Sequence, residues 1–109
     1  LKQELKVAAL ADCATLEDAK VAVKLGADAV VSTFGFLEKE TGIEPDFHLL
    51  EQMIKLGHPV IAEGGFWYPE QVTQAVAMGA WSVVVGSAIT RPLEITKRFV
   101  RALKQAGIN

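Results

Sequence analysis

The chain contains the stretch GADAVVS at residues 26–32, and a similar stretch, GAWSVVVGS, returns at residues 79–87. Each copy follows a short apolar run that ends near an acid, VAALAD at residues 7–12 and PVIAEG at residues 59–64. Self-similarity at a fixed long spacing indicates a repeated supersecondary unit. The sequence therefore predicts one domain over residues 1–109, built from two repeats at about residues 6–57 and 58–107.

The composition is that of an ordinary globular domain. Of the 109 residues, 50% are hydrophobic and 22% are charged, and the net charge is −2. A chain without a basic excess does not attract nucleic acid or an anionic membrane, so neither is an expected partner. The apolar runs are strand-sized, far below the ~20 residues that cross a bilayer, and no cationic region leads into an apolar segment at the N-terminus. We therefore expect a cytoplasmic protein.

Apolar runs alternate with helical patterns along the chain. Short runs without a 3.6-residue period are expected to form buried parallel strands, at residues 6–11, 29–33, 59–62 and 81–85. Amphipathic stretches with helix-start and glycine-stop signals are expected to form helices, at residues 16–25, 46–56, 69–79 and 92–105. The segment from Phe34 to Pro45 is expected to be a long, polar loop, which hints at a functional loop.

This alternation predicts an α/β fold with four parallel strands, each followed by a helix. The same order fits both an open doubly wound sheet and a closed eight-stranded barrel. Acids and glycines at the strand ends favour the barrel, whose site is built from the loops after its strands. Since four strands cannot close a barrel, the predicted fold is a (βα)4 half of a TIM-type (βα)8 barrel with two unpaired edge strands.

Four parts of the chain closely resemble the N-acetylmannosamine-6-phosphate 2-epimerase family: AD and TLE within residues 11–17, EPDF and LL within residues 44–50, PVIAEG at residues 59–64, and VVGSAITRP and EITKRF within residues 84–99. The resemblance covers essentially the whole chain but corresponds only to strands five to eight of that family's barrel. It implies interconversion of N-acetylmannosamine 6-phosphate and N-acetylglucosamine 6-phosphate, in sialic acid catabolism, by removal and return of the C2 proton. No cofactor is expected.

Inversion at one carbon needs two proton-transfer groups that flank that carbon. The resemblance makes Glu63 one of them, and its partner in the family is a lysine from the half of the barrel that is absent here. A carboxylate at a barrel mouth, among apolar side chains, should have its charged form disfavoured and its pKa raised. Glu63 could instead be a salt-bridged or helix-capping acid. Without the lysine, the lone chain is not expected to epimerise.

Barrels of this class often hold phosphate with backbone N–H groups after strands seven and eight. The residues at those places are the expected phosphate ligands: Gly64, Gly65, Gly86 and Ser87. Arg91 resembles the family's phosphate-contacting arginine and is expected to add charge-assisted bonds. The alternative is that the glycines are turn residues and Arg91 is a solvated charge. Asp12 and Thr33 are further substrate-binding candidates at strand ends, although Asp12 could instead cap the next helix.

The loops over the sugar depart from the family pattern. Residues 31–37 read VSTFGFL where family members commonly read GTTLSGY, and residues 65–68 read GFWY in place of a basic and polar run. The aromatic run could stack on a sugar face or meet another chain. No spacing of His, Cys and acidic residues suggests a metal site. The weaker candidates are expected to be structural or solvated: Cys13, His48, His58, and the basic residues of the last helix, Lys97, Arg98, Arg101 and Lys104.

The sequence leaves two main hypotheses. In the first, the chain is half of an epimerase and carries the phosphate grip and one acid/base. In the second, it is a half-barrel assembly module that pairs with another copy, as a homodimer, or with an N-terminal half, without epimerase activity. The internal repeat favours assembly, because a chain already repeated in quarters could be doubled into a full barrel. A third hypothesis is a monomeric, flavodoxin-like sheet that binds a phosphorylated ligand.

Overall fold

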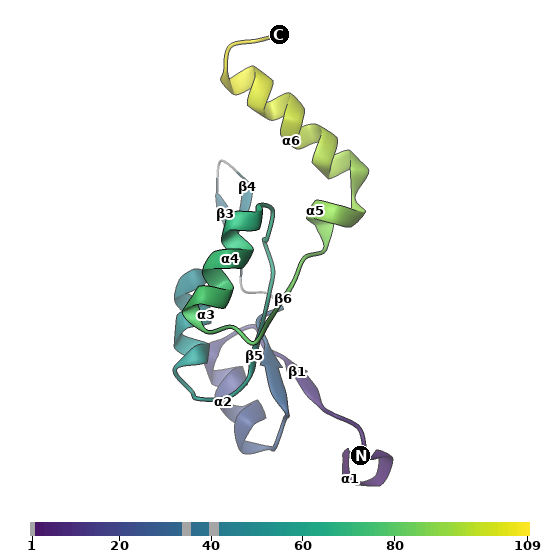
Figure 1. The fold of residues 1–109 in the computed structure, drawn as a ribbon, viewed down its shortest axis with the longest axis vertical. Helices are drawn as coiled ribbons and strands as arrows, with labels where there is room; N and C mark the ends of the chain where they lie inside the picture. The colour runs from purple at the N-terminus through teal and green to yellow at the C-terminus, as the bar shows by residue number, and fades with distance from the viewer. Residues whose placement is uncertain (1, 34–35, 40–41) are drawn as a thin grey trace.

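The computed structural model describes residues 2–33, 36–39 and 42–109. Its centre is a parallel sheet in the order β1-β2-β5-β6, with β1 Leu10–Asp12, β2 Ala29–Val31, β5 Val60–Glu63 and β6 Ser82–Val84. The helices that follow these strands are α2 Leu16–Lys24, α3 Phe47–Ile54, α4 Pro69–Met78 and α6 Pro92–Gln105. Figure 1 shows α2, α3 and α4 on one side of the sheet and α6 leading away from it, which gives an elongated molecule of 58 × 27 × 21 Å.

Consecutive strands of the sheet are also neighbours in space. β1 pairs with β2, β2 with β5 and β5 with β6, and all three pairings are parallel. Parallel neighbours need a crossover connection, and here each crossover carries a helix. The predicted α/β fold, with four parallel strands that are each followed by a helix, is confirmed.

The main core lies between the sheet and α2, α3 and α4. Its largest fully buried side chains are Met53, Val30, Val60 and Cys13. Successive strand residues point to opposite faces, so the neighbours of Val30 and Val60 lie on the other face, where Ala29, Val31 and Ile61 form a second, smaller cluster. We call this second face the inner face. It consists of the alternate strand residues Leu10, Asp12, Ala29, Val31, Ile61, Glu63, Ser82 and Val84.

Helix α2 begins as its sequence predicts. The Thr15 side chain accepts a hydrogen bond from the Asp18 N–H at 3.1 Å, and the Thr15 N–H donates to Asp18 Oδ2 at 2.9 Å. The pKa of the Asp18 carboxyl is lowered by hydrogen bonding to the Thr15 side chain first, then to the Thr15 N–H and the Ala14 N–H. The reciprocal pair is a capping box, in which two otherwise unpaired donors of the helix N-terminus are satisfied locally.

The first strand and the start of the last helical region differ from the sequence predictions. The strand begins at Leu10 rather than Lys6, and Lys6 itself has a φ of 54°, which is left-handed rather than extended. Residues Lys2–Leu5 form a short helix, α1, and Ser87–Thr90 form another, α5, where only connections were expected. Single turns of helix carry too little periodicity to be recognised in a sequence.

The predicted long loop contains an antiparallel hairpin. β3 (Phe36–Lys39) pairs with β4 (Gly42–Pro45), so the prediction of an irregular segment is wrong for these residues. Residues 34, 35, 40 and 41 of that predicted loop lie outside the described residues. The hairpin forms through main-chain hydrogen bonds, which a polar side-chain pattern neither requires nor reveals. No helix among the described residues has the length and apolar character to cross a membrane.

Candidate functional site

The carboxyl ends of β5 and β6 meet at a pocket of about 220 Å³, which we call the strand-end pocket. Parallel strands end at the same edge of their sheet, so the residues that follow each strand converge there. The pocket is lined by Thr33, Ile43, Glu63, Gly64, Gly65, Phe66, Trp67, Val84, Gly86 and Ser87. Six of the eight residues predicted to act on or bind substrate are in that lining, whereas Asp12 and Arg91 are not.

Glu63 is the last residue of β5, opposite Val84 of β6, and lies on the inner face. Its main chain is held by Ser32, whose side-chain oxygen accepts from the Glu63 N–H at 3.0 Å and donates to the Glu63 carbonyl at 3.2 Å. Ser32 is only 3% exposed. Ser32 continues the β2–β5 pairing: its N–H donates to the Ile61 carbonyl, and its side chain bonds the main chain of Glu63, two residues further along β5.

Sequence reasoning did not select Ser32. The only signal in the sequence is a hydroxyl directly after a buried apolar strand, and this residue type is common at strand ends. Its function here depends on Glu63, which is 31 positions away in the chain. Ser32 is therefore a residue whose contribution to the site is visible only once β2 and β5 lie side by side.

The glycine pair after β5 requires glycine for two reasons. Gly64 and Gly65 have φ values of 107° and 75°, in the left-handed region that side chains rarely adopt. A Cβ on Gly65 would also lie 2.5 Å from the carbonyl carbon of Glu44, at the end of the β3–β4 hairpin. Gly86 differs, because its φ is −105° and a Cβ there would meet no atom within 4 Å.

Four main-chain donors border the strand-end pocket. Among the described residues, the N–H groups of Gly65, Gly86 and Ser87 take part in no hydrogen bond outside the helices and the sheet, and the Gly64 N–H directly follows the Glu63–Val84 pair of the β5–β6 ladder. Successive unpaired N–H groups in left-handed or turn conformations form concave sites that bind anions. Gly64 and Gly65 do have turn conformations, as the alternative interpretation in the sequence analysis expects. Those conformations do not exclude an anion beside the two residues.

Asp12 and Arg91 take different positions. The Thr33 hydroxyl donates to Asp12 Oδ1 at 2.7 Å, so Asp12 adjoins the pocket through Thr33. Thr15 is the capping residue of α2, which removes the alternative that Asp12 caps that helix. Arg91 is exposed at the junction of α5 and α6, outside the pocket lining.

The aromatic run divides between the core and the last helix. Phe66 is buried and packs edge-to-face on Phe47, with ring centroids 6.3 Å apart. The guanidinium carbon of Arg98 lies 4.9 Å from the Trp67 ring centroid and 5.1 Å from that of Tyr68, which are cation–π distances. The expectation that Arg98 belongs to a solvated face is wrong in part, because its partly buried guanidinium also lies against two aromatic rings.

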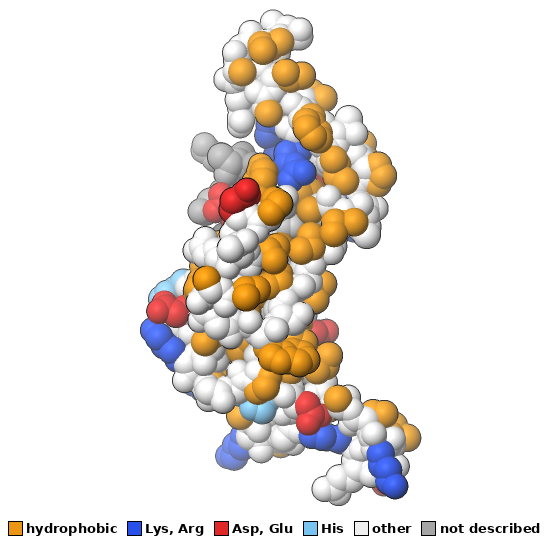
Figure 2. All heavy atoms as spheres, viewed as in Figure 1, with side chains coloured by type: hydrophobic (Ala, Val, Ile, Leu, Met, Phe, Trp, Pro, Cys, Tyr) orange, Lys and Arg blue, Asp and Glu red, His pale blue; other side chains and the backbone are white. Residues whose placement is uncertain are grey.

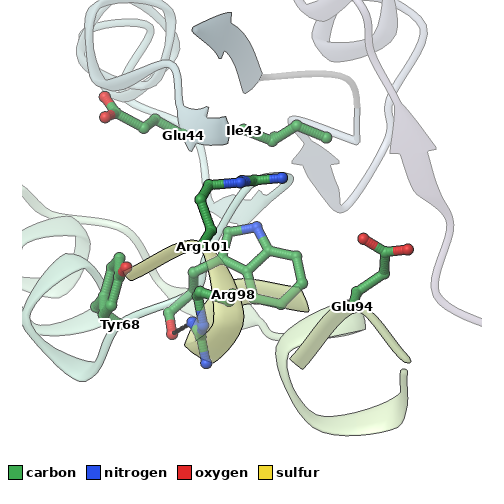
Figure 3. Close-up of a pocket in the computed structure, with 7 residues that line it drawn as sticks. Ile43, Glu44, Tyr68, Glu94, Arg98 and Arg101 are labelled. Atoms are coloured by element: carbon green, nitrogen blue, oxygen red, sulfur yellow. Dashed lines mark hydrogen bonds between the residues drawn. The ribbon is translucent and has the colours of Figure 1, made fainter. Parts of the chain in front are cut away.

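A second pocket, of about 360 Å³, lies between α6 and the loop after β5, and we call it the helix pocket. Figure 3 shows its labelled side chains, with Arg98 beside Tyr68 and Arg101 extending toward Ile43 and Glu44. Trp67 and Ile43 line both pockets. The helix pocket and the strand-end pocket are therefore neighbours that share two wall residues.

The remaining candidates make structural contacts. His58 Nε2 lies 2.8 Å from the Ala27 carbonyl, and His48 is exposed on α3. Cys13 is buried and donates to the Ala11 carbonyl at 3.3 Å, and burial raises the pKa of its thiol. Among the described residues, no group of three or more His, Cys, Asp or Glu side chains is placed to hold a metal ion.

Comparison with known proteins identifies the family. The family model described as "Putative N-acetylmannosamine-6-phosphate epimerase" matches residues 1–105. The chain belongs to this epimerase family. Among curated relatives, each described as a putative N-acetylmannosamine-6-phosphate 2-epimerase, the protein of Caldanaerobacter subterraneus subsp. tengcongensis is 45% identical over 103 residues. That of Malacoplasma penetrans is 46% identical over 99 residues.

The matches cover most of this chain but less than half of each relative. They span 92% of the chain and 44% of the Caldanaerobacter protein, and 86% of the chain and 43% of the Malacoplasma protein. The solved N-acetylmannosamine-6-phosphate 2-epimerase of Clostridium perfringens superimposes with a TM-score of 0.82 at 41% identity, covering 94% of this chain and 46% of that one. The fold is thus half of a barrel of the epimerase family.

We predict that replacement of Ser32 by alanine exposes the Glu63 main chain. Loss of the side-chain acceptor leaves the Glu63 N–H without its partner, and a buried hydrogen bond is worth about 1 kcal/mol or more, so exchange of that amide with solvent should accelerate by about tenfold. Hydrogen exchange measured by NMR tests this. Ser32→Thr, which keeps the hydroxyl, is the matched control and should retain protection. Equal protection of Glu63 in Ser32→Ala would contradict the assignment.

Gly65→Ala is expected to destabilise the fold by about 1–3 kcal/mol, because the left-handed backbone and the approach of Glu44 both exclude a Cβ. Chemical denaturation gives the free energy of unfolding. Gly86→Ala, where the added methyl meets open space, is the matched control and should change that free energy by less than about 1 kcal/mol. If the two variants lose the same stability, close approach at Gly65 is not what requires glycine there.

Proposed function

We propose that the chain is half of an N-acylglucosamine-6-phosphate 2-epimerase barrel. In this function N-acetylmannosamine 6-phosphate is converted to N-acetylglucosamine 6-phosphate, within sialic acid catabolism in the cytoplasm. The observation that carries the proposal is the composition of the strand-end pocket, where Glu63 and the main chain of Gly64, Gly65, Gly86 and Ser87 border one space. A proton-transfer group beside an anion site is what a sugar-phosphate epimerase needs.

The phosphate of the sugar is held by the N–H groups of Gly64, Gly65, Gly86 and Ser87. Glycine allows the main chain to approach the phosphate oxygens closely, and N–H donors bind an anion without bringing a counter-charge that must itself be desolvated. Arg91 lies one residue past α5 and adds a charge-assisted bond once its exposed side chain turns toward the phosphate. Thr33, oriented by its bond to Asp12, supplies a hydroxyl to the sugar.

Glu63 transfers the C2 proton on one side of the sugar. Its carboxylate takes that proton from the open-chain form, and the electron pair of the broken C–H bond moves into an enolate with the neighbouring C1 carbonyl. A protonated group on the opposite side then returns a proton to C2 and inverts the centre. By family resemblance that group is a lysine of the missing half. Ser32 fixes the main chain from which the carboxylate projects.

The alternative function, a half-barrel assembly module, is supported by apolar surface at both margins of the sheet. Leu10 on β1 is 58% exposed, and Trp81 beside β6 is 72% exposed. Figure 2 shows hydrophobic side chains continuing over the C-terminal helix, where Leu93, Phe99 and Leu103 are exposed. Unpaired edge strands with apolar flanks favour association with another chain. In both proposed functions, this chain therefore pairs with an N-terminal half or with a second copy of itself.

Epimerase function is tested by reconstitution. The chain is mixed with the N-terminal part of the Caldanaerobacter relative that it does not match, and incorporation of deuterium at C2 of N-acetylmannosamine 6-phosphate is followed by NMR. We expect exchange by the mixture and none by the chain alone. Glu63→Gln should reduce the rate by about 10²- to 10⁴-fold, the usual contribution of a positioned acid/base. Glu70→Gln, with the same charge change on α4, should not.

Two results would contradict this function. C2 exchange by the isolated chain would show that the lysine-bearing half is not required, and a fully active Glu63→Gln mixture would remove Glu63 from the chemistry.

Assembly is tested by light scattering. The chain alone, of 11.7 kDa, is expected to form species of at least two halves, because its margins are apolar. Leu10→Lys, on the inner face of β1, should weaken the assembly, since it places a charge in the surface that is covered. Glu51→Gln on α3 changes the net charge equally, away from both margins, and should not. A stable monomer of the unmodified chain is the outcome that contradicts assembly.

A further inference from the structure

We propose that Arg98 is a positioning residue for the anion-binding loop, acting from the C-terminal helix on the segment between Glu63 and α4. The inference rests on the proposed function, because it assigns to Arg98 the ordering of the main chain that holds the phosphate. It concerns a side chain that lines the helix pocket but not the strand-end pocket. Arg98 therefore acts through Trp67, which lines both.

Three contacts join Arg98 to this loop. Its Nη1 donates to the Trp67 carbonyl at 2.9 Å. Its guanidinium also lies over the ring of Trp67 and over that of Tyr68, and Figure 3 shows it beside the labelled Tyr68. One planar group thus contacts two consecutive residues, through a hydrogen bond at its edge and aromatic rings at its faces. Lysine cannot reproduce this combination, because its ammonium is a compact point charge without a flat face.

The same peptide is held from the opposite side by α4. Gln71 Oε1 accepts from the N–H groups of Trp67 and Tyr68, at 2.8 and 3.0 Å. The Trp67 N–H is therefore bound by the helix that follows the loop, and its carbonyl by a helix 31 positions further along the chain. With both sides of the peptide bonded, Trp67 is the fixed end of a loop whose other end is fixed at Glu63 by Ser32.

The loop between these two fixed ends contains Gly64 and Gly65. Glycine has the largest conformational entropy to lose, so a glycine pair is ordered only if its ends are held. A loop that is already ordered does not lose that entropy again when an anion binds. Release of the Trp67 carbonyl should therefore weaken anion binding while leaving the N–H groups themselves unchanged.

The contact is not a by-product of apolar packing by α6. This helix contributes no fully buried residue, and Leu93, Phe99 and Leu103 are exposed. Among the described residues, the neighbouring Lys97 forms an ion pair with Glu94 of its own helix, at 3.0 Å. Lys97 therefore offers a matched comparison, because its replacement removes the same charge one position away and, within the described part of the chain, it makes no hydrogen bond or ion pair with the loop.

The experiment compares the full chain with Arg98→Gln, Arg98→Lys and Lys97→Gln. Hydrogen exchange at residues 64–68 reports the order of the loop, and titration with inorganic phosphate, followed by NMR shifts of the Gly64 and Gly65 amides, reports affinity. In Arg98→Gln we expect faster exchange at these residues and phosphate affinity lower by on the order of tenfold, as for other residues that support a ligand from behind its direct contacts. Arg98→Lys should rescue only part of both, and Lys97→Gln should match the unmodified chain. Thermal unfolding should be nearly unchanged in all three.

The outcomes separate this inference from the proposed function. If the unmodified chain binds phosphate and Arg98→Gln binds it equally well, or if Lys97→Gln weakens binding as much, Arg98 does not position the loop and the proposed function is unaffected. Unchanged exchange at residues 64–68 in Arg98→Gln overturns the inference in the same way. If Arg98→Gln frees the loop but no variant binds phosphate, the phosphate assignment of the proposed function fails and, with it, the role of Arg98 in anion binding.

Discussion

The site depends on the parallel direction of the four strands. Since all of them run the same way, their carboxyl ends lie at one edge of the sheet, and the residues after β2, β5 and β6 converge there. An antiparallel strand at any of these positions would send its following residues to the opposite edge. The direction is imposed by the crossover helices, whose apolar faces need the sheet as a covering surface. The packing of the helices on the sheet therefore also brings the residues of the site together.

The same architecture leaves the domain unfinished. Helices cover one face, whereas the inner face carries Glu63, its half-exposed neighbour Val84 and, at the β1 margin, the half-exposed Leu10. In a closed barrel this face becomes the interior. Its polar end then lies at the C-terminal opening of the barrel, above a packed apolar core. Completion of the barrel would bury the sheet margins and enclose the pocket in a single step. The proposed chemistry therefore depends on the proposed assembly.

The pattern of successes and failures in the sequence predictions has a physical reason. Helices α2, α3, α4 and α6 were predicted within about two residues, because their caps, glycine stops and apolar spacing are local signals. The parallel direction of the strands followed from the alternation of elements, whereas that alternation fits more than one strand order. The β3–β4 hairpin and the short helices α1 and α5 were missed, since each is stabilised by main-chain bonds over a few residues with little side-chain pattern. Arg98 was misassigned because helical spacing alone does not show what the side chain meets.

By itself, the sequence determined the residue types at the strand ends, among them Glu63, the Gly64–Gly65 pair and Ser87. A carboxylate, two glycines and a hydroxyl after buried runs are local facts. Only the tertiary structure decided which of the candidates share a pocket, that Arg91 lies outside it, and that Ser32 and Arg98 bond the main chain at the two ends of the loop. Those contacts join residues about 31 positions apart. Their geometry depends on how sheet and helices pack, which no short stretch of the chain encodes.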